Sequence, residues 1–131
     1  EHISSKIKPA LKKGKVVICD RFTDSTQAYQ VYGKKVKKSF INNIHNVILQ
    51  KIRPNLVFIL KVNQKSAHKR LVKRKNKNRY DKFAKSFYIK AQNSFLKISK
   101  NKRNYYVLNS SSNDTILEKK IFSIVCRHLK I

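Results

Sequence analysis

An acid-base pair stands at the end of an apolar run near the start of this 131-residue sequence. The run is Val16–Cys19, and the pair is Asp20 and Arg21. Hydroxyl and amide side chains follow closely: Ser25, Thr26, Gln27, Tyr29 and Gln30. In open parallel sheets, ligands lie beyond the carboxyl ends of the strands. The pattern is therefore typical of an α/β enzyme that presents a phosphate-binding edge.

Helices and strands alternate along the chain in an order that would position such an edge. We expect a helix over about Ile3–Lys13 that Gly14 stops in a left-handed conformation, and then a short buried strand over Lys15–Asp20. Apolar residues at helical spacing predict the next helix, which Pro54 ends: Phe40, Ile41, Ile44, Val47, Ile48 and Ile52. A second apolar strand is expected over Leu56–Val62.

The second half of the chain repeats the alternation. A basic helix is expected over Gln64–Lys75, and a long helix resumes near Asp81. Apolar residues of that long helix keep a spacing of three or four, which favours a core face over a base-stacking platform: Phe83, Phe87, Ala91, Phe95 and Ile98. A third strand over Tyr105–Leu108 and a final amphipathic helix over about 116–129 complete the pattern. It predicts one α/β domain over 1–131, with a parallel sheet, flanking helices and right-handed crossovers.

The charge of the chain is strongly positive. Its formal net charge of +26 comes from 32 Lys and Arg against 6 Asp and Glu. Such a charge would suit a polyanionic partner, so a small basic RNA-binding module is one alternative function. The basic residues are spread over every segment, however, and no RNA-binding motif is present. We therefore favour a solvated lysine-rich surface over a nucleic-acid groove.

Cysteine usage and hydropathy bear on the compartment. Cys19 and Cys126 each lie in an apolar segment, and we interpret both as small buried hydrophobic residues. The four histidines are too scattered for a metal motif. No apolar run reaches the ~20 residues that span a bilayer, and the expected compartment is the cytoplasm.

Several motifs resemble those of the thymidylate kinase family. The strand end Asp20-Arg21-Phe22 is followed by Ser25-x-x-Ala28-Tyr29-Gln30 at the family's spacing. The likeness continues at Ile7–Leu11, at Arg53–Leu56 and at Arg79-Tyr80. This resemblance implies a P-loop NTPase of the nucleoside monophosphate kinase fold. In that fold the strand order is two-three-one-four-five, and the three strands expected here would be the third, fourth and fifth.

One motif of that family is missing from the sequence. The only glycines are Gly14 and Gly33, and neither opens a G-x-x-x-x-G-K-[ST] loop. We therefore interpret the chain as a carboxyl-terminal fragment of one kinase domain, incomplete because the first strands and the P-loop are missing. Unpaired backbone groups in the middle of a sheet are costly, so we expect the isolated chain to be unstable or only partly ordered.

The resemblance also implies an activity. Members transfer the γ-phosphate of ATP to dTMP, giving dTDP for dTTP biosynthesis, and the expected requirements are ATP as co-substrate, Mg²⁺ and a homodimer. Arg21 would bind the phosphate of dTMP, because a guanidinium offers a planar fork that matches phosphate oxygens. Asp20 would order Mg²⁺ through water or orient Arg21.

The remaining acceptor-side residues are assigned by the same resemblance. Ser25 and Thr26 would lie in the region of the acceptor phosphate and base, and Tyr29 on the sugar face. Gln30 would bind the thymine edge, since an amide can donate to a carbonyl and accept from a ring N–H together.

The basic segment over about 69–81 resembles the mobile lid that closes over ATP. Its candidate catalytic residues are three arginines: Arg70, Arg74 and Arg79. The sequence departs from the family at Asn78, where Asp is common, and at Asp81, where Glu is common. A solvated lysine-rich helix is the alternative interpretation of this segment.

A neighbouring enzyme class shares the Asp-Arg strand end. Another P-loop nucleoside or nucleotide kinase is therefore a second alternative. The Ala28-Tyr29-Gln30 sequence at its fixed distance from Arg21 favours thymidylate as the acceptor.

Overall fold

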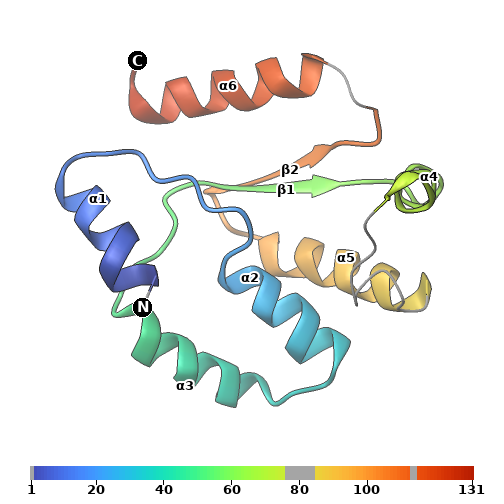
Figure 1. The fold of residues 1–131 in the computed structure, drawn as a ribbon, viewed down its shortest axis with the longest axis horizontal. Helices are drawn as coiled ribbons and strands as arrows, with labels where there is room; N and C mark the ends of the chain where they lie inside the picture. Colours follow the sequence, from blue (N-terminus) through green and yellow to red (C-terminus); the bar gives the residue numbers. More distant parts are fainter. Residues whose placement is uncertain (1, 76–84, 113–114) are drawn as a thin grey trace. The chain divides into compact units, whose positions relative to one another are not determined.

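The computed structural model describes residues 2–75, 85–112 and 115–131 (Figure 1). The chain forms two compact units, each built from two stretches of sequence. Unit 1 comprises Glu1–Asn55 and Ser86–Ile98, and unit 2 comprises Leu56–Lys85 and Ser99–Ile131. The expectation of a single domain over the whole chain stays a prediction.

The described part of unit 1 is helical. Its elements are the π-helical turn η1 (Ile3–Ile7), α1 (Lys8–Lys12), α2 (Thr23–Thr26), the π-helical segment η2 (Gln27–Gly33), α3 (Lys38–Leu49) and most of α5 (Lys85–Ser99). Gly14 stops the first helix as predicted, because its φ of 68° lies in the left-handed region and its N–H donates to the Leu11 carbonyl at 3.0 Å. The N-terminal helix is therefore confirmed, with a π-helical first turn that the sequence pattern did not predict.

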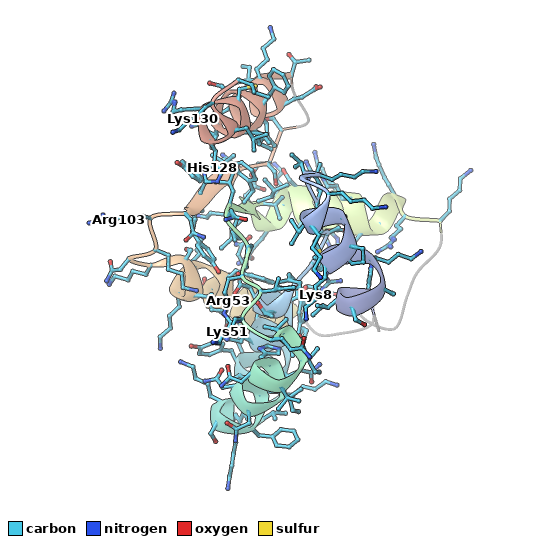
Figure 2. The ribbon with its side chains drawn as sticks, turned by 90° about the vertical axis from the view of Figure 1, so that its left-hand side faces the viewer. Lys8, Lys51, Arg53, Arg103, His128 and Lys130 are labelled. Carbon is cyan, nitrogen blue, oxygen red and sulfur yellow. The ribbon has the colours of Figure 1, made fainter. Side chains whose placement is uncertain are left out.

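The helix α3 ends earlier than its apolar pattern predicts. Gln50 and Lys51 take left-handed φ angles of 45° and 72°, so the helix stops at Leu49, well before Pro54. The side chain of Gln50 accepts a hydrogen bond from the ammonium group of Lys8, which ties this turn to α1. Figure 2 labels Lys8, Lys51 and Arg53, basic residues of this unit. The prediction that Pro54 ends the helix is wrong, because the left-handed pair has already redirected the chain.

Residues 15–19 have no regular secondary structure. Val16 and Ile18 are 63% and 94% exposed, and Cys19 is exposed as well. The predictions of a buried strand over Lys15–Asp20 and of a buried Cys19 are therefore wrong. A strand forms only where ladder hydrogen bonds to a neighbour satisfy its backbone groups, and this segment has no such neighbour in the described part of the chain.

Unit 2 contains a parallel pair of strands. Strand β1 (Val57–Lys61) lies beside β2 (Tyr105–Asn109), with Ile59 opposite Val107 (Figure 1). Hydrogen bonds extend the ladder beyond both ends, since Val57 N–H donates to the Asn104 carbonyl at 2.9 Å and Ser110 N–H to the Lys61 carbonyl at 2.7 Å. The expected pairing of the second and third predicted strands is confirmed.

Two helices accompany this pair. Helix α4 (Gln64–Lys73) follows β1, and α6 (Thr115–Leu129) follows β2. Ile59 and Leu108 are buried at 8% and 5% exposure and form the apolar centre of the strand pair. Within the residues that the structure describes, no helix combines the length and apolar character needed to cross a membrane.

Candidate functional site

The acid-base pair lies in the turn that leads into α2. Asp20 and Arg21 are both exposed, and the N–H of Ser25 donates to the Phe22 carbonyl at 3.0 Å as the helix begins. Arg21 has a φ of 67°, in the left-handed region that costs a residue with a Cβ about 1–2 kcal/mol. The turn therefore holds Arg21 in a backbone conformation that other contacts have to stabilise.

One such contact joins Arg21 to the ring of Tyr29. The central carbon of the Arg21 guanidinium lies 4.9 Å from the centre of that ring. A cation over an aromatic face at this distance gains about 0.5–1 kcal/mol at an exposed site. A guanidinium has five N–H donors, so an arginine in such a contact can still donate to an anion.

The Tyr29 ring is held by two aromatic rings of α5. Its centre lies 5.8 Å from that of Phe87, at an interplanar angle of 34°, and 6.1 Å from that of Phe95, at 77°. Such pairs contribute about 0.5–1.5 kcal/mol each beyond the area they bury. The predicted packing face is confirmed for Phe87 and Phe95, which contact Tyr29, and for Ala91 and Ile98, which are 3% and 8% exposed. Phe83 lies outside the described residues.

The other acceptor-side residues lie on the same short helical stretch. Ser25 and Thr26 are in α2, Gln30 is in η2, and all of them are half-buried. The carbonyl of Gln30 accepts a hydrogen bond from Val36 N–H at 2.9 Å, which closes the end of this stretch. π-Helical segments are frequent at functional sites, so the geometry of η2 agrees with a binding role.

The pKa of His45, in α3, depends on burial and on the charges near this stretch. Burial lowers the pKa of His45, the Arg53 guanidinium lowers it further, and the carboxylate of Asp24 in α2 opposes the shift. The ordinary pKa of 6.5 therefore falls in the folded protein.

The lid arginines are in unit 2, and Arg70 contacts the loop that follows β2. Its Nη2 donates to the carbonyl of Ser110 at 2.7 Å and to that of Ser111 at 3.4 Å. Arg74 is the exposed residue that caps the carboxyl end of α4, and Arg79 lies outside the described residues. The structure thus gives Arg70 a definite partner, the backbone of the β2–α6 loop.

Asn63 is a residue of this loop cluster that the sequence analysis missed. Its side-chain oxygen accepts from Ser66 N–H at 2.8 Å and caps α4, while its own N–H donates to Ser111 Oγ at 2.9 Å. The signal was present, because an Asn directly after an apolar strand and three residues before a Ser is a typical helix cap. The carboxyl ends of both strands are thereby joined.

In the described ranges, no group of three or more His, Cys, Asp and Glu side chains could hold a metal ion.

A family profile described as Thymidylate kinase matches residues 1–121, a range that contains both the Arg21 turn and the Arg70 cluster. The chain belongs to the thymidylate kinase family.

Relatives agree with this membership. The chain is 43% identical over 101 residues to the thymidylate kinase of Wolbachia sp. subsp. Brugia malayi, a match that covers 77% of this chain and 47% of the relative. It is 37% identical over 135 residues to the thymidylate kinase of Ehrlichia ruminantium, covering 100% of this chain and 62% of the relative. It spans less than two thirds of the length of these relatives.

A solved structure supports the P-loop kinase fold. The crystal structure of thymidylate kinase from Ehrlichia chaffeensis matches with a TM-score of 0.70 and 25% sequence identity, covering 95% of this chain and 59% of that one. The expected family and fold class, an α/β nucleoside monophosphate kinase fold present in part, are therefore confirmed. The roles of the individual site residues stay predictions.

Proposed function

We propose that this chain carries the acceptor side of a dTMP kinase, which transfers the γ-phosphate of ATP to dTMP and yields dTDP. The observation that supports this most directly is the placement of the Arg21 guanidinium over Tyr29, at the start of the helical stretch that also carries Ser25, Thr26 and Gln30. A phosphate-binding arginine and polar groups for a base and a sugar are thus provided by one segment.

In the reaction, this segment would position the acceptor and supply positive charge. In phosphoryl transfer the attacking phosphate oxygen must approach the γ-phosphate despite the negative charge of both groups. A fixed guanidinium at Arg21 would neutralise the acceptor phosphate and fix its orientation through paired N–H donors. Asp20, next to it in the turn, would orient that guanidinium or reach a magnesium ion through water.

The base and sugar of the acceptor would be bound by residues further along the helical stretch. Gln30 can donate to one thymine carbonyl and accept from the ring N–H. Tyr29 would border the sugar, and Ser25 and Thr26 would lie near the phosphate and base.

The donor side of the proposal involves the lid. Arg70, Arg74 and Arg79 are the candidates for charge stabilisation at the transferring phosphoryl group. The Arg70 contact to the backbone of Ser110 and Ser111 favours a structural role for this arginine.

Family membership supports the rest of the proposal. ATP would be the co-substrate and would bring Mg²⁺ with its phosphates, and the active form would be a homodimer in the cytoplasm.

The test joins this chain to the P-loop segment of the Ehrlichia ruminantium enzyme. We expect the joined protein to form dTDP from dTMP, with kcat/KM for dTMP at least tenfold above that for dCMP or dAMP, since a mismatched polar edge costs about that much or more. Equal rates for the three nucleotides would contradict the assignment.

A second experiment measures binding to the same joined protein in the absence of ATP. Calorimetric titration should show tighter binding of dTMP than of thymidine, because only dTMP offers a phosphate to Arg21. The matched control is Arg103→Ala, which removes the same charge from an exposed position of unit 2 (Figure 2) and should leave dTMP affinity unchanged.

A further inference from the structure

The ring of Phe87 lies against the backbone of Gly33. A Cβ placed on Gly33 would be 2.8 Å from Cε2 and 3.2 Å from Cζ of Phe87. Real Cβ atoms essentially never approach other atoms at 2.8 Å, so a Cβ at position 33 would force the Phe87 ring to move. Left-handed backbone is not what favours a glycine at this position, because the positive-φ glycine of the described chain is Gly14.

The end of η2 is fixed on α5 by a second contact. The ammonium group of Lys97 lies 5.7 Å from the centre of the Tyr32 ring. Tyr29, Tyr32 and Gly33 of this helical stretch each contact a residue of α5. The segment η2 therefore meets α5 through contacts that involve both aromatic rings and close backbone approach.

Phe87 connects the contact at Gly33 to Tyr29, the ring that contacts Arg21. Its ring lies next to the space left by Gly33 and contacts the Tyr29 ring at 5.8 Å. The Tyr29 ring also contacts the Arg21 guanidinium, at 4.9 Å. A change in the position of the Phe87 ring must therefore change the surface on which the Arg21 side chain rests.

Arg21 depends on such a surface. Its side chain is exposed, long and attached to a backbone at φ 67°, so local geometry alone does not fix the guanidinium. Preorganised donors bind an anion better than donors that must be ordered on binding.

We propose that Phe87 is a positioning residue for Arg21, acting through the ring of Tyr29, in the space that Gly33 leaves open. Its consequence for dTMP affinity rests on the proposed function. The positioning itself is a property of unit 1 and is measured without any ligand.

The first experiment measures the Arg21 side chain by NMR in the protein joined to the P-loop segment, with isotope labels in the 131 residues of this chain, because the isolated chain is expected to be only partly ordered. The Tyr29 ring current should shift the Arg21 Hδ protons upfield, and Tyr29→Phe should keep that shift whereas Tyr29→Leu should remove it. Phe87→Leu should remove about half of it or more, because the Tyr29 ring loses its support. An unchanged Arg21 shift in Phe87→Leu would overturn the proposal, as would the absence of any such shift in the unaltered chain.

Two further variants distinguish a change in the position of Arg21 from a general loss of folded structure. Gly33→Ala removes no ring but pushes the Phe87 ring away, so it should reduce the Arg21 shift in the same direction. Phe58→Leu removes a ring that lies 5.9 Å from Tyr106 in unit 2, a pair of matching geometry, and should leave the Arg21 shift unchanged. Equal effects of Phe58→Leu and Phe87→Leu on Arg21 would identify a general stability effect and overturn the proposal.

A further experiment measures dTMP affinity and relates the position of Arg21 to the proposed function. Phe87→Leu should weaken dTMP binding about two- to fivefold, the range expected for loss of one exposed cation–π contact, and should leave thymidine binding unchanged. If the unaltered joined protein binds no dTMP, the proposed function fails, while the Arg21 signals still decide the positioning. An unchanged dTMP affinity in a variant with a displaced Arg21 would show that the position of Arg21 does not determine dTMP affinity. That result would overturn the link between Phe87 and dTMP binding.

Discussion

Arg21 and Tyr29 form a cation–π contact in which the guanidinium carbon lies 4.9 Å from the ring centre. The family resemblance assigns these residues separate tasks, one at the phosphate and one at the sugar. In the structure, the Tyr29 ring, which the resemblance assigns to the sugar, also contacts the Arg21 guanidinium. Changes at Tyr29 should therefore affect phosphate binding as well as sugar selectivity.

Arg21→Ala should lower dTMP affinity about tenfold to a hundredfold, because it removes charge-assisted hydrogen bonds to the phosphate. Arg21→Lys should recover only part of this loss, since an ammonium keeps the charge but lacks the planar fork. Titration calorimetry with dTMP measures both variants. In the protein joined to a P-loop segment, ATP affinity should stay the same, and unchanged turnover of Arg21→Ala would remove Arg21 from the site.

Arg70→Ala should destabilise unit 2 by about 1–2 kcal/mol, because the carbonyls of Ser110 and Ser111 lose a charged donor. Denaturant unfolding measures this loss, and Lys69→Ala, an exposed basic residue on the same helix, is the matched control. A large fall in kcat with unchanged stability would instead identify Arg70 as a catalytic residue of the lid.

Stability should depend on pH through His45. Burial and the Arg53 charge hold its pKa below 6.5 in the folded state, so the unfolded chain binds the proton first as pH falls. The free energy of unfolding should therefore decrease as pH drops from 6.5 to the lowered pKa of the folded protein, and then level off. His45→Gln should abolish this part of the profile in melts between pH 7.5 and 5, whereas His128→Gln, exposed in α6, should not.

The isolated chain should be only partly ordered. Val16 at 63% exposure and Ile18 at 94% leave apolar surface in water, no large side chain of the described residues is less than 2% exposed, and the described sheet has two strands. Sheets of this size need further packing to be independently stable. Circular dichroism should show a broad thermal transition with dye binding to exposed apolar surface. A sharp, cooperative transition at high temperature would contradict this prediction.

The elements with strong local signals were predicted from sequence. The apolar strands that became β1 and β2, the basic helix α4 and the Gly14 stop all depend on residue spacing or on one residue's conformational freedom. The segment from Asp20 to Gln30 was equally recognisable, because its side-chain types and spacing match a family that the comparisons confirm.

The sequence could not show which apolar segments pair with a neighbouring strand. Residues 15–19 have the composition of a buried strand, but a strand needs a neighbour to satisfy its backbone, and composition does not supply one. The sequence by itself determined the family and the residues of the acceptor segment. Only the tertiary structure decided that Phe87 packs on Tyr29, that Tyr29 supports Arg21, and that Arg70 holds the backbone of the β2–α6 loop. These contacts join residues far apart in the chain, and their geometry depends on how helices and strands pack, which local patterns do not encode.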